Sequence, residues 1–234
     1  MEIAAQEVIG QEVVGQEVAG QDIIGQEVAE QATGWEEIET TKPQPSRWRW
    51  YHGLAVYVAA EVVGYGLGKL AEKAMGNKTT REAQDPFYES LKQPAYAPPG
   101  PAFPIVWAVN NTARVSGLIR VLNKPTGAPG RSAYLTLQGT SLLNYASFNA
   151  AYFGLRSPRL GAAMTVADLA LAVASGYVAL AKLEDPKVTA SLSTLVPWLV
   201  LASAVSVPVA LWNEDKFFAS PPRLDALEGW VKEG

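Results

Sequence analysis

Long uncharged stretches of apolar residues, separated by short charged or proline-containing segments, dominate the chain from about residue 50 onward. The clearest stretch is 188–212, which contains no charged residue. The hydrocarbon core of a bilayer needs roughly 20 helical residues, so this stretch predicts a transmembrane helix. Residues 132–155 form a second uncharged stretch, and residues 160–181 form a third whose only charge is Asp168.

Two weaker apolar stretches come earlier in the chain. Residues 52–68 are apolar except for Glu61 and follow an aromatic and basic segment that suits a membrane interface. Residues 103–122 follow a proline-rich approach and contain Arg114. The sequence therefore predicts an all-α membrane protein, a bundle of five transmembrane helices with a Pro-rich loop between the first two. A soluble helical protein is the alternative, and three long stretches almost without charge argue against it.

The beginning of the chain has a different character. Residues 6–30 repeat with a period of five, and residues 1–40 hold ten acidic residues and neither Lys nor Arg. A five-residue period places the apolar residues on no single face of a helix or strand, and the recurring glycines weaken a helix. We expect residues 1–46 to be a flexible acidic extension and linker, with a pentapeptide solenoid as the alternative. The membrane domain is then 47–216, and 217–234 form a C-terminal tail.

Composition excludes several kinds of chemistry. The chain has no cysteine, which rules out disulfides, thiolate metal sites and a cysteine nucleophile. Its single histidine, His52, leaves no partner for a His-rich metal site or an ordinary Ser-His triad. No phosphate-binding or dinucleotide-binding fingerprint is present. We expect no enzymatic activity, no metal, no obligatory cofactor and no nucleic-acid partner; the expected partners are the lipid bilayer and a hydrophobic small molecule.

Three charged residues, Glu61, Arg114 and Asp168, lie within predicted spans, where isolated charges are costly. Arg114 could pair with Glu61 or with Asp168. The alternative is that Glu61 lies near the interface and that Asp168 is satisfied by a hydrogen bond. Ala146 and Ala150 have the spacing of small residues at helix contacts, which hints at a homodimer.

Four motifs follow one another along the membrane domain. They are FYESLKQPAYAPPG at 87–100, FPIVW at 103–107, YFGLRSP at 152–158 and LVPWL at 195–199. This ordered set resembles the TspO/MBR family, the tryptophan-rich sensory proteins and the translocator protein or peripheral benzodiazepine receptor. The resemblance covers roughly residues 52–216.

The resemblance implies five helices around a cavity that takes porphyrins and drug-like aromatic ligands, with sterols binding as well. Trp107 matches the family's helix-two Trp, whereas Tyr96, Asn111 and Phe148 replace aromatic residues that are usual there. The ligand-binding residues implied are Tyr96, Pro98, Pro99, Phe103, Trp107, Asn111, Arg114, Asn144, Tyr145, Phe148, Tyr152, Trp198 and Ser203.

The prolines between residues 94 and 104 cannot continue a helix, so this segment predicts either a stiff extended lid over a pocket or a loop that only caps the bundle. We expect a binding protein for a hydrophobic planar ligand, a tetrapyrrole above all, acting in sensing, sequestration or transport. The alternative is a structural or regulatory subunit of a larger complex whose cavity is filled by its own side chains.

Overall fold

The structure is a computed structural model that describes residues 47–79, 81–227 and 229–232. The predicted acidic extension, residues 1–46, lies outside the described residues. The described part is helical and contains no strand, only two isolated β-bridges. Its elements are α2 (Trp50–Met75), α3 (Arg81–Ser90), α4 (Ala102–Leu122), α5 (Arg131–Asn149), the π-helical turn η1 (Ala150–Gly154), α6 (Pro158–Ala181), α7 (Pro186–Ala190) and α8 (Leu195–Trp212).

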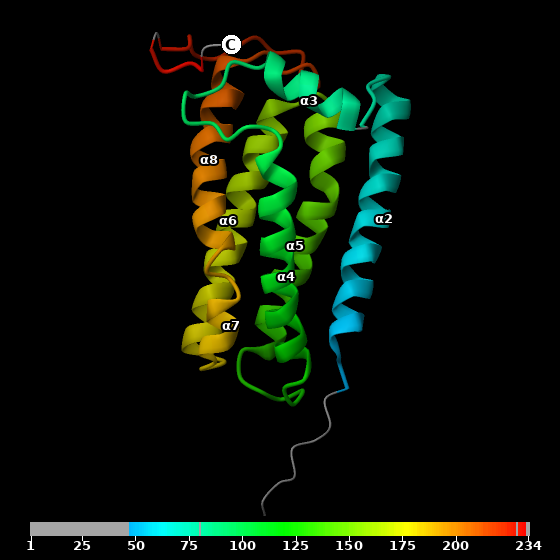
Figure 1. Ribbon diagram of the computed structural model, residues 1–234, viewed down its shortest axis with the longest axis vertical. Helices are drawn as coiled ribbons and strands as arrows, with labels where there is room; N and C mark the ends of the chain where they lie inside the picture. Colours follow the sequence, from blue (N-terminus) through cyan, green and yellow to red (C-terminus); the bar gives the residue numbers. More distant parts are fainter. Residues whose placement is uncertain (1–46, 80, 228, 233–234) are drawn as a thin grey trace, which may run out of the picture. The chain divides into compact units, whose positions relative to one another are not determined.

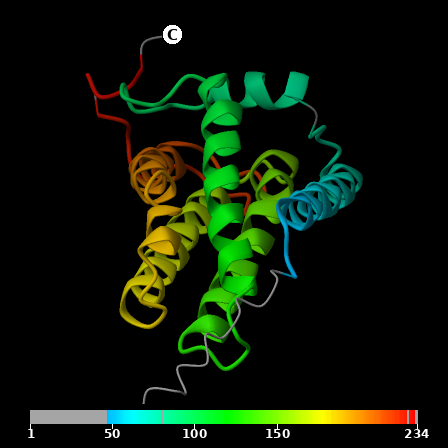
Figure 2. The same cartoon turned by 60° about the horizontal axis from the view of Figure 1, so that its bottom comes forward.

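Helices α2, α4, α5, α6 and α8 lie lengthwise beside one another, and the short helix α3 crosses one end of this bundle (Figures 1 and 2). Successive long helices run in alternating directions, as short connections require (Figure 1). Helix α6 packs most extensively against α8 and α5, while α2 contacts mainly α5 and η1. Helix α6 is therefore central and α2 peripheral.

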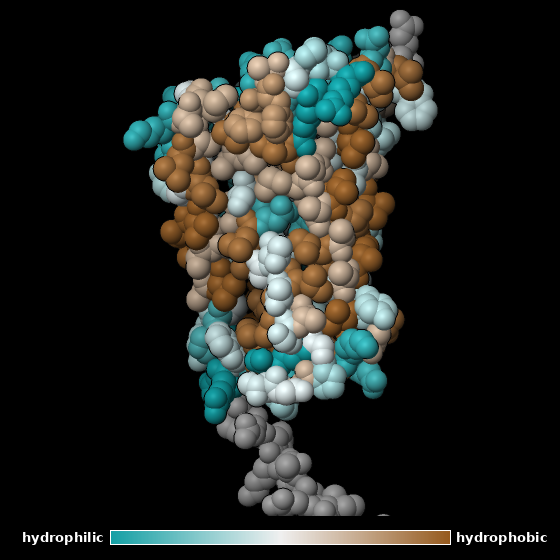
Figure 3. Space-filling model, turned by 180° about the vertical axis from the view of Figure 1, so that it is seen from behind, coloured by the Kyte–Doolittle hydropathy of each residue, from teal (hydrophilic) through white to brown (hydrophobic). Residues whose placement is uncertain are grey.

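Three helical stretches are long and apolar enough to cross a membrane: α2, α6, and the α7–α8 stretch Pro186–Trp212. They correspond to three of the five predicted spans. Figure 3 shows a broad hydrophobic belt at mid-height between two hydrophilic ends. Large apolar side chains such as Leu143, Val173 and Val200 are exposed on the helices. Exposed apolar surface of this kind is expected where lipid tails are the solvent, and the protein is an integral, multi-pass membrane protein.

Two helices begin with the same local signal, a capping side chain followed by proline. The Ser157 hydroxyl accepts a hydrogen bond from the backbone N–H of Leu160 at 3.2 Å, and Pro158 is the first helical residue of α6. Asp185 caps α7 in the same way, ahead of Pro186. Proline is favourable there because its missing N–H would have no partner in the first turn.

The interior contains polar residues where the sequence predicted an ion pair. Arg114 donates from Nε to Gln138 Oε1 at 2.8 Å and from Nη2 to the Gln138 carbonyl at 3.2 Å. Gln138 in turn donates to Ser175 at 2.8 Å, and Ser141 donates to Asp168. Among the described residues, Arg114 forms no ion pair with Glu61 or Asp168. A neutral residue, Gln138, accepts both hydrogen bonds of the guanidinium instead, and Nη1 is buried without a partner.

The small residues of α5 serve packing inside the chain. Ala146 is buried, and a Cβ atom placed on Gly64 of α2 would lie 2.8 Å from the Ala146 carbonyl oxygen. Helices α2 and α5 can approach closely only because Gly64 has no side chain. Helix α2 covers this face of α5 within the chain. The homodimer stays a prediction.

A compact ionic cluster joins the ends of α4 and α6 on the side away from α3. Arg120 Nε lies 2.8 and 2.7 Å from the two carboxylate oxygens of Asp185, and Lys124 Nζ lies 2.9 Å from one of them. Burial alone would raise the pKa of Asp185. The hydrogen bonds from Lys124 and Arg120 outweigh burial and lower the pKa from 3.8 to about 2.

We predict that the ionised Asp185 carboxylate contributes to the free energy of unfolding and that this contribution is lost in acid. The lowered pKa means that ionised Asp185 stabilises the fold above about pH 4, and that this contribution is lost as pH falls through about 2. Between pH 5 and 2, we expect the free energy of unfolding to fall by about 2 kcal/mol more in the wild type than in Asp185→Asn. Unfolding in detergent at both pH values measures this. Asp225→Asn, at an exposed position, serves as control, and an Asp185→Asn protein with wild-type acid dependence would contradict the assignment.

Candidate functional site

A cavity of about 490 Å³ lies between α4, α5, α6 and α8 in the half of the bundle that α3 crosses. Helix α2 contributes Tyr57 and Glu61, and α3 contributes Gln84 and Tyr88. A volume of this size is typical of sites for drug-sized ligands.

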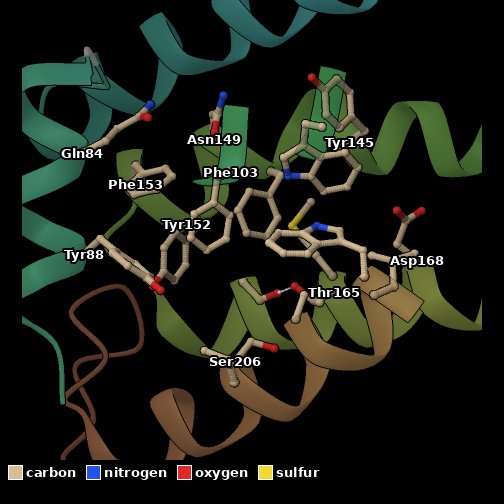
Figure 4. A pocket seen from close by; sticks show the side chains of 18 of the residues that line it. Gln84, Tyr88, Phe103, Tyr145, Asn149, Tyr152, Phe153, Thr165, Asp168 and Ser206 are labelled. Atoms are coloured by element: carbon tan, nitrogen blue, oxygen red, sulfur yellow. Dashed lines mark hydrogen bonds between the residues drawn. The ribbon is translucent and has the colours of Figure 1, made fainter. Parts of the chain in front are cut away.

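Aromatic side chains form most of the cavity wall (Figure 4). Phe103 meets Trp198 edge to face with ring centroids 5.4 Å apart, and Trp107 lies against Tyr145 at 5.2 Å. Phe148 stacks on Tyr152 at 5.4 Å. The rings converge because their spacing of three or four residues places them on one face of each helix. Rings fixed by one another present a stiff apolar surface that suits a flat aromatic molecule.

The end of the cavity nearest α3 is covered by the segment before α4. Pro98 and Gly100 line the cavity, and the Tyr88 hydroxyl donates to the Pro98 carbonyl at 3.0 Å. Burial raises the pKa of Tyr88 to about 12. Pro104 lies in the first turn of α4, so the non-helical segment ends before it.

Asn213, at the end of α8, and the C-terminal tail both bind the segment that precedes α4. The side chain of Asn213 accepts from the Lys92 N–H and donates to the Lys92 carbonyl, both at 2.9 Å. Further along, Ala95 N–H donates to the Trp230 carbonyl at 2.9 Å, and Lys232 N–H donates to the Gln93 carbonyl at 2.8 Å. The tail therefore belongs to the structure around the cavity.

Polar groups gather at the opposite, deeper end. Figure 4 shows Asp168 and Tyr145 at one end of the cavity and Gln84 and Tyr88 at the other. The Tyr145 hydroxyl donates to Glu61 Oε1 at 2.7 Å, and Asn144 Nδ2 donates to the Met164 carbonyl at 3.0 Å. The cavity is thus apolar along its walls and hydrogen-bonding at its base.

The structure brings together most of the residues that the sequence indicated. Those that line the cavity are Pro98, Phe103, Trp107, Asn144, Tyr145, Phe148, Tyr152 and Trp198. The remaining ones, which do not line it, are Tyr96, Pro99, Asn111, Arg114 and Ser203.

The residues outside the cavity have other surroundings. Tyr96 is 48% exposed and donates to the Ala204 carbonyl at 3.0 Å, on the outside of α8. Asn111 and Arg114 are buried one and two turns along α4 from Trp107, beyond the base of the cavity. There α4, α5 and α6 pack around the polar side chains. Asn111 and Arg114 therefore lie on the same face of α4 as Trp107, but the cavity does not extend as far as them.

Several lining residues were not assigned to the site from the sequence. Glu61 and Asp168 were recognisable as charges within apolar stretches, which is a signal of function in membrane proteins. Thr165 and Ser206 carried no such signal. Gln84 and Tyr88 were missed because no sequence pattern indicated α3, a helix that contains Pro86. Within the described residues, no group of three or more His, Asp and Glu side chains could hold a metal ion.

A helical membrane protein with an aromatic cavity beneath a covering loop has the architecture of a membrane binding or sensory protein. A sequence model of the TspO/MBR family matches residues 57–212, more than half of the chain, and the chain belongs to this family. The match extends from the second turn of α2 to the last residue of α8 and confirms the resemblance read from the motifs. No individual curated protein matches the chain.

Proposed function

We propose that this protein binds a hydrophobic planar ligand in the cavity, with tetrapyrroles as one candidate class, and that it senses, sequesters or transfers that ligand within the membrane. The observation that carries the proposal is the cavity of about 490 Å³ with aromatic walls from α4, α5 and α8. An interior filled by its own side chains, as in a purely structural subunit, would leave no such space.

The proposal includes all five spans. Helices α4 and α5 are more polar than the other three, because they carry Asn110, Asn111, Arg114 and Gln138. These side chains are buried and face neighbouring helices, where polar groups are tolerated in a bilayer. Helices α4 and α5 then cross the membrane with polar faces inward, while α2, α6 and α8 supply much of the lipid-facing surface.

Trp107 tests the proposal directly. Detergent-purified protein is titrated with protoporphyrin IX dimethyl ester, whose ring carries no free carboxylate, and the Soret absorbance is followed. We expect a saturable shift in the wild type and about a tenfold loss of affinity in Trp107→Ala, since that substitution removes a large aromatic face from the cavity wall.

The matched control is Trp50→Ala, because Trp50 is 73% exposed and lies outside the cavity. It should bind like the wild type. A wild-type protein that gives no saturable shift, or an equal loss of affinity in both variants, would argue against a ligand site in this cavity.

A further inference from the structure

The charged residues that line the cavity are all acidic. They are Glu61 of α2 and Asp168 of α6, and among the described lining residues there is no Lys, Arg or His. Asp168 is only 3% exposed. Glu61 is joined to Tyr145 by a hydrogen bond, and Figure 4 places Tyr145 and Asp168 at the same end of the cavity. Both carboxyl groups therefore lie toward the same end of the cavity, with Asp168 buried and Glu61 exposed.

Several side-chain donors near this base already donate to groups inside the protein. Tyr145 donates to Glu61 at 2.7 Å, Asn144 to the Met164 carbonyl at 3.0 Å and Thr165 to the Gly161 carbonyl at 2.8 Å. The carboxyl groups keep acceptor capacity, because each has two oxygens with about four acceptor positions. Only one oxygen of Asp168 accepts from Ser141, and only Oε1 of Glu61 accepts from Tyr145. The carboxyl groups at the base thus keep free acceptor positions, while the hydroxyl donors beside them are used within the protein.

The buried cation of this region does not change that balance. Arg114 does not line the cavity; its Nε and Nη2 atoms donate to Gln138, and its Nη1 atom is buried without a hydrogen-bond partner. The indole N–H of Trp198 is buried without a partner, but Trp198 packs against Phe103 in the aromatic wall. A ligand group at the base would therefore meet carboxyl oxygens with no cation among the lining side chains.

From these observations we infer that the cavity selects planar aromatic ligands carrying a cationic or hydrogen-bond-donating group, such as a protonated amine, and disfavours ligands that place a carboxylate at the base. The inference rests on the proposed function and names the ligand class of the same site. Its physical reason is that charges interact strongly where water is excluded, as around the buried Asp168: an ammonium is attracted by this carboxylate and a carboxylate is repelled by it. The exposed Glu61 adds a weaker effect of the same sign.

A set of three ring-matched probes tests this. The probes are 1-pyrenemethylamine, 1-methylpyrene and 1-pyrenecarboxylic acid, which present a cation, no charge and an anion on one ring system. Binding to the full-length protein in a neutral detergent is followed by energy transfer from tryptophan to pyrene. We expect the amine to bind about tenfold more tightly than the acid, as a charge-assisted hydrogen bond allows.

Two substitutions locate the selectivity. Asp168→Asn should reduce the ratio of amine affinity to acid affinity about fivefold and leave 1-methylpyrene unchanged. Glu61→Gln should reduce the ratio less, because Glu61 is exposed on α2, and it provides the test if Asp168→Asn fails to fold. Asp225→Asn, on the exposed tail, is the matched control and should keep the wild-type ratio. Comparing the same probes across variants cancels their different partitioning into micelles.

The outcomes separate this inference from the proposed function. If 1-methylpyrene and the porphyrin diester bind but the acid binds as well as the amine, the inference on charge is overturned and the aromatic site stands. A ratio that is unchanged in both Asp168→Asn and Glu61→Gln also overturns it. If none of the three pyrenes nor the porphyrin diester binds, both the inference and the proposed function fail.

Discussion

Replacing Gly161 by valine is expected to abolish ligand binding. Gly161 is buried in α6 and lines the cavity, and a Cβ atom there would overlap the ring of Tyr152. That ring is held by Phe148 at 5.4 Å and by Phe153 at 4.7 Å, so its free direction is the cavity itself. We expect the affinity for protoporphyrin IX dimethyl ester to fall at least about 100-fold, because the displaced ring takes the place of the ligand.

The matched control lies in the same helix. Gly176 has no atom within 4 Å of the position that its Cβ would occupy, so Gly176→Val adds the same methyl groups in open space. It should bind the porphyrin diester like the wild type, measured by the Soret titration. Affinity of Gly161→Val within about threefold of the wild type would show that Tyr152 does not border the ligand site.

Replacing Asp215 by alanine should cause the largest loss of stability outside the membrane-spanning helices. Asp215 is fully buried just after α8, and its carboxylate accepts from the Ser157 hydroxyl at 2.7 Å and from the backbone N–H groups of Arg159 and Phe218, both at 3.0 Å. It thereby connects the start of α6 to the C-terminal tail. The substitution removes the acceptor of the buried Ser157 hydroxyl and of two partly buried backbone N–H groups, and we expect the free energy of unfolding to fall by about 3 kcal/mol.

Thermal unfolding in detergent, followed by tryptophan fluorescence, measures this loss. Asp215→Asn should recover part of it, since an amide oxygen still accepts a hydrogen bond, and Asp225→Ala at an exposed position should be neutral. The role assigned to Asp215 is wrong if alanine at 215 is tolerated as well as alanine at 225.

The sequence could predict which face of a helix carries the site residues, but not which of these residues line the cavity. The positions of Trp107, Asn111 and Arg114 show that these residues share one side of α4. Their spacing does not show at which height the neighbouring helices converge. The structure leaves open space beside Trp107 and closes it around Arg114, where Gln138 accepts the guanidinium hydrogen bonds. For the same reason the sequence left the partner of Arg114 open. Among the described residues Arg114 pairs with neither Glu61 nor Asp168, and Asp168 accepts a hydrogen bond from Ser141, as the alternative had it, since the partner of a buried charge depends on the register between helices.

What the amino-acid sequence by itself determined is the membrane character of the chain and its family. The length of an apolar stretch can be compared directly with the thickness of a bilayer. The ordered motifs between residues 87 and 199 are local features that can be recognised without a tertiary structure. Only the tertiary structure decided that α3 lines one end of the cavity, that the C-terminal tail pairs with the segment before α4, and that Glu61 and Asp168 both line the cavity. These arrangements join residues far apart in the chain, and such contacts depend on how whole helices pack rather than on any local pattern.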